Sequence, residues 1–588
     1  MNVLLAFPRF PRDTFWSFDR ALALSGRRST MPPLGLLTVA GLFPAGRFRF
    51  SLADENVGPI EDDDISGADL VLVSAMLVQL ESLEVLVERC RRLGTRVIVG
   101  GPLISGCFKE LRERGLDPDC WFIGEAERML PELIDDLDAG RLRQVYAHVP
   151  TQSRADQVRE AFDERAHILQ EDLPGLDTSP VPRFDLVDMR HYHSMAIQAS
   201  RGCPIGCEFC DIWKQFGLKS RTGDPGRLLA QLDYLNTLGW RGRVFIVDDN
   251  FIGNVSSARR FLDALAEWQL SRKSFRVPVA FEQAIPESRL DRLRRRFRSR
   301  RSPFAFSTEA DVRLGDTAPK MTALRLGMQR AGFNSVFLGI ESPSTESLRE
   351  AGKQVNIGRD GQAIEHLLAR VHNIQRAGMV AMAGFIVGFD DDPDDIDQGM
   401  IEFIDRSGIP LAMVGLLGVI PGTALQERLE REGRYRARLV GSQTHEFSLN
   451  FRPKNRSEDS ILDKYGRVLR AVYGDGMRPY YRRCEQMMAR MPSPAPTGDR
   501  VGWREIKAFA RSLIGIRPRL SYWSFLLRTL LRRPRFIGQA VVLALQGEHL
   551  HRLTSVKLAA YDARTIRRSA RVNQNLSSTA FRIVPPAA

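Results

Sequence analysis

"RGCPIGCEFCDIW", residues 201–213, contains three cysteines separated by three and then two residues. It overlaps "SMAIQASRG" (194–202), the first of six β-rich runs. The other five are "RVFIVDDN" (243–250), "FAFSTEA" (304–310), "SVFLGIES" (335–342), "AMAGFIVGFD" (381–390) and "PLAMVGLLGV" (410–419). Helical stretches such as 225–239 and 362–378 separate them. This alternation predicts a barrel or partial (β/α)6 barrel over 194–425, with the cysteines directly after its first strand.

The first 147 residues alternate in the same way. Continuous runs of Val, Leu and Ile predict buried parallel strands at 2–7, 49–54, 69–75 and 96–101. Helical periodicity at 34–43 and 80–93 completes an α/β pattern, which predicts a doubly wound, Rossmann-like domain. Ligands of such sheets bind at the carboxyl ends of the strands. A polar, proline-containing stretch, 148–193, is the expected linker to the barrel.

Composition sets the broad class of the protein. The chain has 588 residues, enough for several domains, and its 43% hydrophobic and 26% charged residues are ordinary for a folded protein. Seven cysteines, an odd number with three clustered, do not suit a secreted disulfide scaffold. No export signal or spanning apolar run is evident, so we expect a cytoplasmic protein, with association at the inner face of the membrane left open.

The positive charge lies mostly near the C-terminus. Residues 501–570 hold 14 Lys and Arg against 3 Asp and Glu, a surplus of 11 in a net charge of +13. We expect 426–588 to be mostly helical and basic. Within it, 521–547 carries an apolar helical face with arginines nearby, for which core packing is the default and anionic membrane contact the alternative. A second basic segment, 289–301, lies in an insertion near 270–303 and lacks the interleaved aromatics of a nucleic-acid site, so no nucleic acid is expected.

Two kinds of metal site compete for Cys203, Cys207 and Cys210. Structural zinc takes four protein ligands, commonly as two CxxC-like pairs, and the sequence has no second pair. His191 or His193 could supply a fourth ligand, so zinc stays an alternative. An iron–sulfur cluster held by three thiolates leaves one iron open for a substrate or cofactor. The spacing favours the cluster.

The motif "CPIGCEFC" at the end of the first barrel strand resembles the radical S-adenosylmethionine (SAM) superfamily. The preceding domain, with "MPPLG" (31–35), "SAM" (74–76), "GGP" (100–102) and "GEAE" (124–127), resembles the cobalamin (B12)-binding class B methylases within it. The subgroup of hopanoid C-2 methylase and its relatives is the most similar, through "FVDDNFIGN"-like and "IPLAMVGLLGVIPGTAL" runs.

The resemblance implies a set of site residues. Cys203, Cys207 and Cys210 are the implied catalytic and metal ligands of a [4Fe-4S] cluster. Asp248, Asp249 and Asn250 stand where the family binds the methionine amino group, although Gly-Gly-Glu is commoner there. Glu341 stands at the ribose, and Gly384, Ile386 and Gly388 at the adenine. Phe209 and Glu309 complete the implied SAM contacts. For each of these residues the alternative is a purely structural role, in a turn, in a surface ion pair or in close strand packing.

The resemblance also implies cobalamin contacts at the strand ends of the first domain: Pro33, Gly35, Ser74, Met76, Gly100, Gly101, Gly124 and Glu125. The first histidine of the chain is His148, so residues 1–147 contain no imidazole that could ligate cobalt. The lower face of a bound cobalamin is then expected to meet water or another group. A cobalamin-free domain is the alternative.

The implied activity is methylation of an unactivated carbon through a 5′-deoxyadenosyl radical and methylcobalamin. The expected partners are a small-molecule substrate, with lipids among the candidates, and an electron donor such as flavodoxin or ferredoxin. Two alternatives stay open: a cobalamin-assisted cyclisation or rearrangement without methyl transfer, and a non-enzymatic cofactor- or zinc-binding regulatory module. Peripheral membrane contact through the C-terminal region is also left open.

Overall fold

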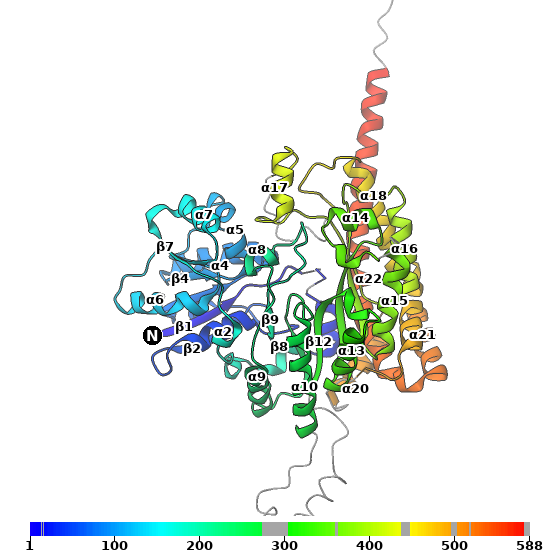
Figure 1. Ribbon diagram of the computed structural model, residues 1–588. Coiled ribbons are helices and arrows are strands. Elements are labelled where there is room, and N and C mark those ends of the chain that lie inside the picture. Colours follow the sequence, from blue (N-terminus) through cyan, green and yellow to red (C-terminus); the bar gives the residue numbers. More distant parts are fainter. Residues whose placement is uncertain are drawn as a thin grey trace, which may run out of the picture.

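The computed structural model describes residues 1–12, 14–15, 17–272, 304–358, 363–436, 447–495, 503–516 and 519–580. Two sheets lie side by side, and a helical C-terminal region covers the side of the second sheet that is remote from the first (Figure 1). The arginine-rich segment 289–301 and most of the expected insertion lie outside the described residues.

The first sheet is parallel throughout and has seven strands in the order β2-β1-β3-β4-β5-β6-β7. The strands are β1 (Asn2–Phe7), β2 (Arg49–Asp54), β3 (Leu70–Ser74), β4 (Val97–Gly100), β5 (Cys120–Ile123), β6 (Val145–Val149) and β7 (Ala166–Gln170). The four predicted strands are confirmed. The sheet reverses its direction of growth between β1 and β3, as in a doubly wound fold.

Helices cover both faces of this sheet, because alternate strand side chains point to opposite sides. One face packs on α3 (Asp62–Ser66), α4 (Leu80–Leu93), α5 (Pro102–Glu113) and α7 (Gln152–Phe162). The other packs on α2 (Leu34–Leu42) and α6 (Ala126–Asp138). The short helix α1 (Asp19–Ser25) instead contacts the C-terminal helices.

The segment expected as a linker, 148–193, differs from the prediction. Its first part completes β6 and forms α7 and β7, which extend the first sheet to Gln170. Neither strand is a continuous run of Val, Leu and Ile, since β6 reads VYAHV and β7 reads AHILQ, and the helix is polar on one side, so their apolar signal is weak in the sequence. The remaining residues run to the second sheet through short 3₁₀ turns.

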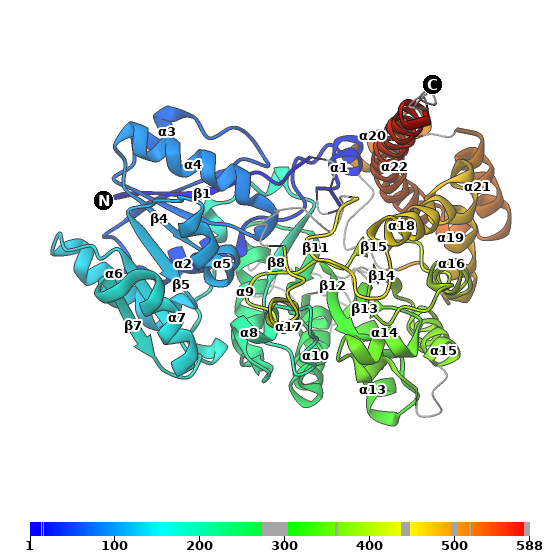
Figure 2. The ribbon, with the colours of Figure 1, turned by 90° about the horizontal axis from the view of Figure 1, so that it is seen from above.

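The second sheet has six parallel strands in the order β15-β14-β13-β12-β11-β8. They are β8 (Ser194–Ile197), β11 (Gly242–Ile246), β12 (Phe304–Asp311), β13 (Phe333–Glu341), β14 (Val380–Val387) and β15 (Ala412–Leu416). All six correspond to predicted runs. Viewed from above, the strands follow an open arc with helices outside it, a partial barrel (Figure 2).

The helices of this unit are α8 (Ile212–Phe216), α9 (Pro225–Thr237), α10 (Val255–Arg272), α13 (Pro319–Ala331), α14 (Thr345–Glu350), α15 (Ala363–Arg376), α16 (Ile396–Ser407) and α17 (Ala424–Arg431). The C-terminal region consists of α18 (Glu458–Tyr473), α19 (Arg478–Arg490), α20 (Trp503–Gly515), α21 (Arg519–Arg532) and α22 (Ile537–Ala580). Its buried side chains are continuous with the core of the second sheet. The predicted helical character of this region is confirmed. Among the described residues, no helix is both long and apolar enough to cross a bilayer.

Candidate active site

A closed loop presents the three cysteines at the end of the first barrel strand. Two short strands, β9 (Ser200–Arg201) and β10 (Arg221–Thr222), pair antiparallel and fix the two ends of this loop. Gly202 has φ +87°, and a Cβ there would meet the carbonyl oxygens of Lys219, Phe216 and Gly217 at 2.7–2.9 Å. Only glycine allows the two ends to approach so closely. The loop is therefore preformed by its backbone.

The acidic side chains at the end of β11 hold the same loop. Asp248 accepts hydrogen bonds from the Ala199 amide (2.7 Å) and the Ser200 hydroxyl (2.8 Å), one on each carboxylate oxygen. Asp249 accepts a hydrogen bond from the Gly202 amide at 3.0 Å. Burial raises the pKa of Asp248 to about 7 and that of Asp249 to about 6. The structure brings these residues to the cysteine loop, and their direct contact with SAM stays a prediction.

Asn250 links the loop to the next strand. Its amide Nδ2 lies 3.8 Å from the Cys203 sulfur and donates to Asp311 at 2.9 Å, and its Oδ1 accepts from the Asp311 amide at 3.2 Å. Asp311 in turn forms an ion pair with Arg313 at 2.7 Å. The sequence did not single out Asp311 or Arg313. An amide directed at a sulfur favours the thiolate form that a metal requires.

Glu341 and Lys353 form a buried ion pair beside the cysteines. The Lys353 Nζ lies 2.5 Å from a carboxylate oxygen of Glu341, and both residues are buried. Glu341 has φ +65°, a strained conformation for a non-glycine residue, at the point where the pairing of β13 and β14 shifts register. Burial raises the pKa of the Cys207 thiol to about 11, and the positive charge of Lys353 opposes this shift. Sequence reasoning found Glu341 and missed Lys353.

The predicted adenine residues lie on the strand next to Glu341. Gly384 pairs with Gly339 in the register of β13 and β14, and a Cβ at Gly384 would lie 3.9 Å from Glu341 Oε2. Ile386, two residues along β14, is half-buried and points the same way along the strand. Phe209 of the cysteine loop lies 6.1 Å from Phe389, ring centre to ring centre. Glu309, on β12, has its pKa raised to about 7 by burial.

Asp392 lies in the turn after β14, and its contribution to the free energy of unfolding should depend on pH. It accepts hydrogen bonds from the Ser347 hydroxyl (2.6 Å) and the Gly388 amide (2.8 Å), yet burial raises its pKa from 3.8 to about 6. Because the folded-state pKa is the higher one, the stabilisation from the protonated carboxyl is complete below about pH 4 and is lost as the pH rises through about 6.

Asp392→Asn removes this titration. In urea unfolding of the protein between pH 4 and pH 7, we expect the free energy of unfolding of wild type, relative to that of the variant, to fall with rising pH. The slope should reach at most about 1.4 kcal/mol per pH unit. A difference that does not change with pH would contradict the burial argument.

The predicted cobalamin residues gather at the carboxyl edge of the first sheet, which faces the cysteine loop. Ser74, Gly100 and Gly101 end β3 and β4, and Gly124 follows β5. Helix α8 of the cysteine loop contacts α5 there, and a Cβ on Gly106 would lie 3.2 Å from Gln215 Nε2. Pro33 precedes α2, Gly35 lies in its first turn, and Met76 is exposed beyond β3. Their contacts with cobalamin stay predictions.

Glu125 has a definite role in this structure as a link between the sheets. Its carboxylate forms ion pairs with Arg201 (2.9 Å) and Arg221, the residues of β9 and β10 that close the cysteine loop. Glu127 adds a second contact to Arg201 at 2.8 Å. Burial acts to raise the pKa of Glu127, but the charge of Arg201 and the hydrogen bonds from Ser179 and the backbone together offset it and hold the pKa below its usual value. Both carboxylates were visible in "GEAE", but their partners were not.

The inference that the first domain lacks an imidazole is wrong. The sheet extends past residue 147, so His148 belongs to β6. Its side chain is buried, and neither ring nitrogen has a hydrogen-bond partner. Its carbonyl oxygen occupies the place that a Cβ on Gly124 would take. Gly124, at φ +92°, is therefore needed for strand packing whatever else it contacts.

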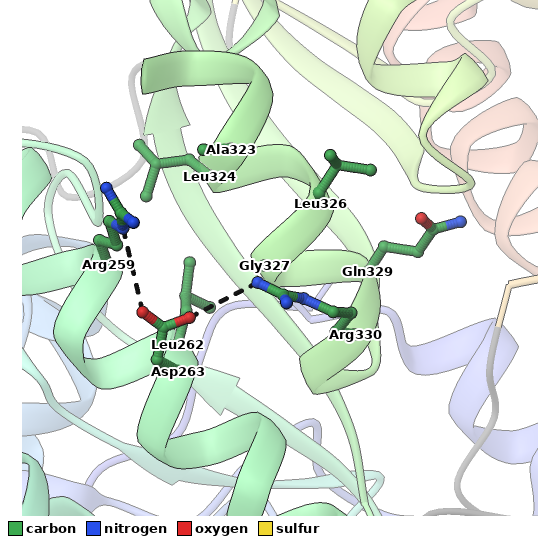
Figure 3. A pocket seen from close by; sticks show the side chains of 9 residues that line it. All are labelled: Arg259, Leu262, Asp263, Ala323, Leu324, Leu326, Gly327, Gln329 and Arg330. Atoms are coloured by element: carbon green, nitrogen blue, oxygen red, sulfur yellow. Dashed lines mark hydrogen bonds and ion pairs between the residues drawn. The ribbon is translucent and has the colours of Figure 1, made fainter. Parts of the chain in front are cut away.

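A cavity of about 270 Å³ lies away from these residues, between α10 and α13 (Figure 3). Among its lining residues, Asp263 of α10 forms ion pairs with Arg259 on the same helix at 3.9 Å and with Arg330 of α13 at 3.5 Å. None of the predicted site residues lines it.

The cysteine loop fits a cluster better than a single ion. Within the described ranges, no three His, Cys, Asp or Glu side chains converge as ligands of one ion. A [4Fe-4S] cluster binds each thiolate through a different iron, so its ligands stand apart around it. The glycine-closed loop, the Asn250 amide beside Cys203 and the Lys353 charge near Cys203 and Cys207 suit an anionic cluster held by the three thiolates. The zinc alternative gains no support.

Comparison with known proteins agrees with this arrangement. Residues 22–134 match the B12 binding domain, and residues 423–561 match a domain of unknown function, DUF4070. An "Uncharacterized methyltransferase sll1242" from Synechocystis sp. is 34% identical over 474 residues, 80% of this chain and 76% of the relative. The "Hopanoid C-2 methylase" of Rhodopseudomonas palustris is 28% identical over 541 residues, 90% of each chain.

The fold has a counterpart among solved structures. The cobalamin-dependent S-adenosylmethionine radical enzyme OxsB, solved with aqua-cobalamin bound, superposes with a TM-score of 0.54 at 14% identity, over 97% of this chain and 81% of that one. The regulatory-module alternative is not supported, since the relatives are named as methyltransferases. The chain belongs to the cobalamin-binding radical SAM methyltransferases, whose cofactors are a [4Fe-4S] cluster, S-adenosylmethionine and cobalamin.

Proposed function

We propose that this enzyme methylates an unactivated carbon of an apolar, lipid-like small molecule, with polycyclic triterpenoids of the hopanoid class as the first candidates. The observation that carries the proposal is the similarity to a hopanoid C-2 methylase along 90% of both chains. That similarity includes the helical C-terminal region as well as the two sheets.

When bound, the cluster and SAM supply an adenosyl radical that removes a hydrogen atom, and cobalamin supplies the methyl group. The chain's own residues bind these cofactors and orient them toward the substrate. Cys203, Cys207 and Cys210 would hold the cluster, in a loop that Asp248 and Asp249 fix through its backbone. We propose that Glu341, with Gly384 and Ile386 on the adjacent strand, contacts the nucleoside part of SAM. Lys353 would hold the Glu341 carboxylate in place through their ion pair.

The ion pairs of Glu125 and Glu127 would set the distance between the two cofactors. They connect the strand ends of the first sheet to the two ends of the cysteine loop. A methyl donor on one sheet and a radical source on the other must both reach the same substrate carbon, so a rigid connection serves the reaction. A flavodoxin or ferredoxin is the proposed electron donor.

The substrate proposal is tested with anaerobically reconstituted enzyme, hydroxocobalamin, a chemical reductant and SAM that carries a trideuteromethyl group. A deuterated hopanoid lipid is the substrate. We expect a lipid product in which a trideuteromethyl group has replaced one deuterium atom, and that deuterium atom in the 5′-deoxyadenosine. Deuterium in 5′-deoxyadenosine without S-adenosylhomocysteine would instead indicate the rearrangement alternative. No deuterium transfer from this lipid would reject it as the substrate.

A further inference from the structure

The outer face of α21 is a continuous exposed apolar surface. Leu520, Trp523, Leu527, Leu530 and Leu531 are each between 47% and 86% exposed. At about 100° per residue, these five positions fall within one arc of the helix about 100° wide. They are hereafter the outer stripe. Figures 1 and 2 both place α21 at the outer edge of the helical region, away from the first sheet.

The opposite side of α21 already holds the helix in the fold. Tyr522, Phe525 and Leu526 are buried, and the Phe525 ring stacks on Tyr481 of α19 with 4.6 Å between ring centres. Arg528 anchors one flank through an ion pair with Glu485 at 2.7 Å. The outer stripe therefore lies on the side of α21 that faces away from these anchoring contacts, and large apolar side chains gathered on one exposed face of an anchored helix indicate an interaction surface.

The charged residues of α21 and of the segment after it are all arginines, and one of them, Arg528, is paired with Glu485 of α19. Residues 519–547 contain five arginines and no Asp or Glu. Arg532 and Arg535 are exposed at the end of the stripe, and Arg533 is partly exposed beside them. Helices that lie in the surface of an anionic bilayer combine leucines and tryptophan on one face with arginine or lysine at its edges.

We propose that the outer stripe of α21 docks on the surface of an anionic lipid bilayer, with Arg532 and Arg535 at the phosphate level and the leucines and Trp523 in the acyl boundary. The choice of a lipid surface rather than a protein partner rests on the proposed function, because an apolar lipid substrate is held in a membrane. The exposed face and its charge stand independently of that substrate.

The test uses the full chain without added cofactors, so its outcome does not depend on methyl transfer. Binding is measured by co-sedimentation with vesicles of equal parts phosphatidylglycerol and phosphatidylcholine, and with vesicles of phosphatidylcholine alone. We expect binding to the anionic vesicles that weakens as salt is added. Leu527→Asp with Leu531→Asp should weaken it at least about tenfold, and so should Arg532→Glu with Arg535→Glu.

Val85→Asp is the matched control, since Val85 is an equally exposed apolar residue on α4 of the first sheet. It should bind as wild type does. Circular dichroism verifies that each variant is folded. Equal vesicle binding by the Leu527/Leu531 variant would overturn the proposal. Failure of the wild-type chain to bind either kind of vesicle would also overturn it. If the wild type is then a dimer and the Leu527/Leu531 variant is not, the outer stripe is the contact surface for a second copy of the chain.

Discussion

Cys207→Ala abolishes the formation of 5′-deoxyadenosine, down to the level of a reaction without enzyme. Cys207 is the most buried of the three loop cysteines, and its removal leaves two thiolates for a cluster that needs three. The loop itself should persist, because its shape depends on the β9–β10 pairing and on the Asp248 and Asp249 hydrogen bonds. The measurement is 5′-deoxyadenosine by chromatography after anaerobic reconstitution, together with iron content and the visible absorption of the cluster.

Cys484→Ala serves as the control for this variant. Cys484 is also buried but lies on α19, in the helical C-terminal region. It should keep the cluster spectrum and the 5′-deoxyadenosine yield. Retention of an intact cluster and full activity by Cys207→Ala would show that the loop does not hold the cluster in the way described.

Glu125→Gln lowers the free energy of unfolding by about 3–5 kcal/mol, the usual cost of removing one partner from a buried ion pair. The Glu125 side chain is 4% exposed, and its loss leaves the Arg221 guanidinium, itself only 11% exposed, without a carboxylate. Arg201 keeps Glu127, so the cost falls toward the lower end of this range. Urea unfolding at pH 7 measures it.

A surface ion pair gives the matched control for Glu125. Glu88 contacts Arg91 at 3.3 Å on α4, where its side chain is 72% exposed. Glu88→Gln should change the free energy of unfolding by no more than about 0.5 kcal/mol. Equal effects of the two substitutions would mean that the Glu125 cluster does not tie the two sheets together.

The sequence predicts the strands whose apolar runs are long and continuous. All six strands of the second sheet and four strands of the first fall in this class, since buried parallel strands leave an uninterrupted Val, Leu and Ile signal. β5 (CWFI), β6 (VYAHV) and β7 (AHILQ) are no shorter than β4, but Cys, Trp, Tyr, His or Ala interrupts their Val, Leu and Ile, so the pattern does not stand out. Their omission also produced the mistaken view of His148.

The sequence likewise predicts part of the site, the residues that belong to local motifs, and misses the residues that pair with them in the fold. The cysteines and the residues at strand ends are local features of the sequence. The structure brings Asp248, Asn250 and Glu341 to the cysteine loop, and Gly384 lies beside Glu341. Their partners are tertiary contacts: Lys353 lies 12 residues from Glu341 in sequence, and Arg201 lies 76 residues from Glu125. No spacing rule in one sequence reveals such pairs. The order of the cofactors along the chain came from the family resemblance.

The most direct test of the account is a product measurement on wild-type enzyme, reconstituted anaerobically with iron and sulfide, supplied with hydroxocobalamin and SAM, and reduced with dithionite. A radical methyltransferase with this arrangement should form both S-adenosylhomocysteine, from methylation of cobalamin, and 5′-deoxyadenosine, from reductive cleavage of SAM. Formation of neither product by protein with an intact cluster spectrum would contradict the assignment of the cysteine loop and the facing sheet to these cofactors.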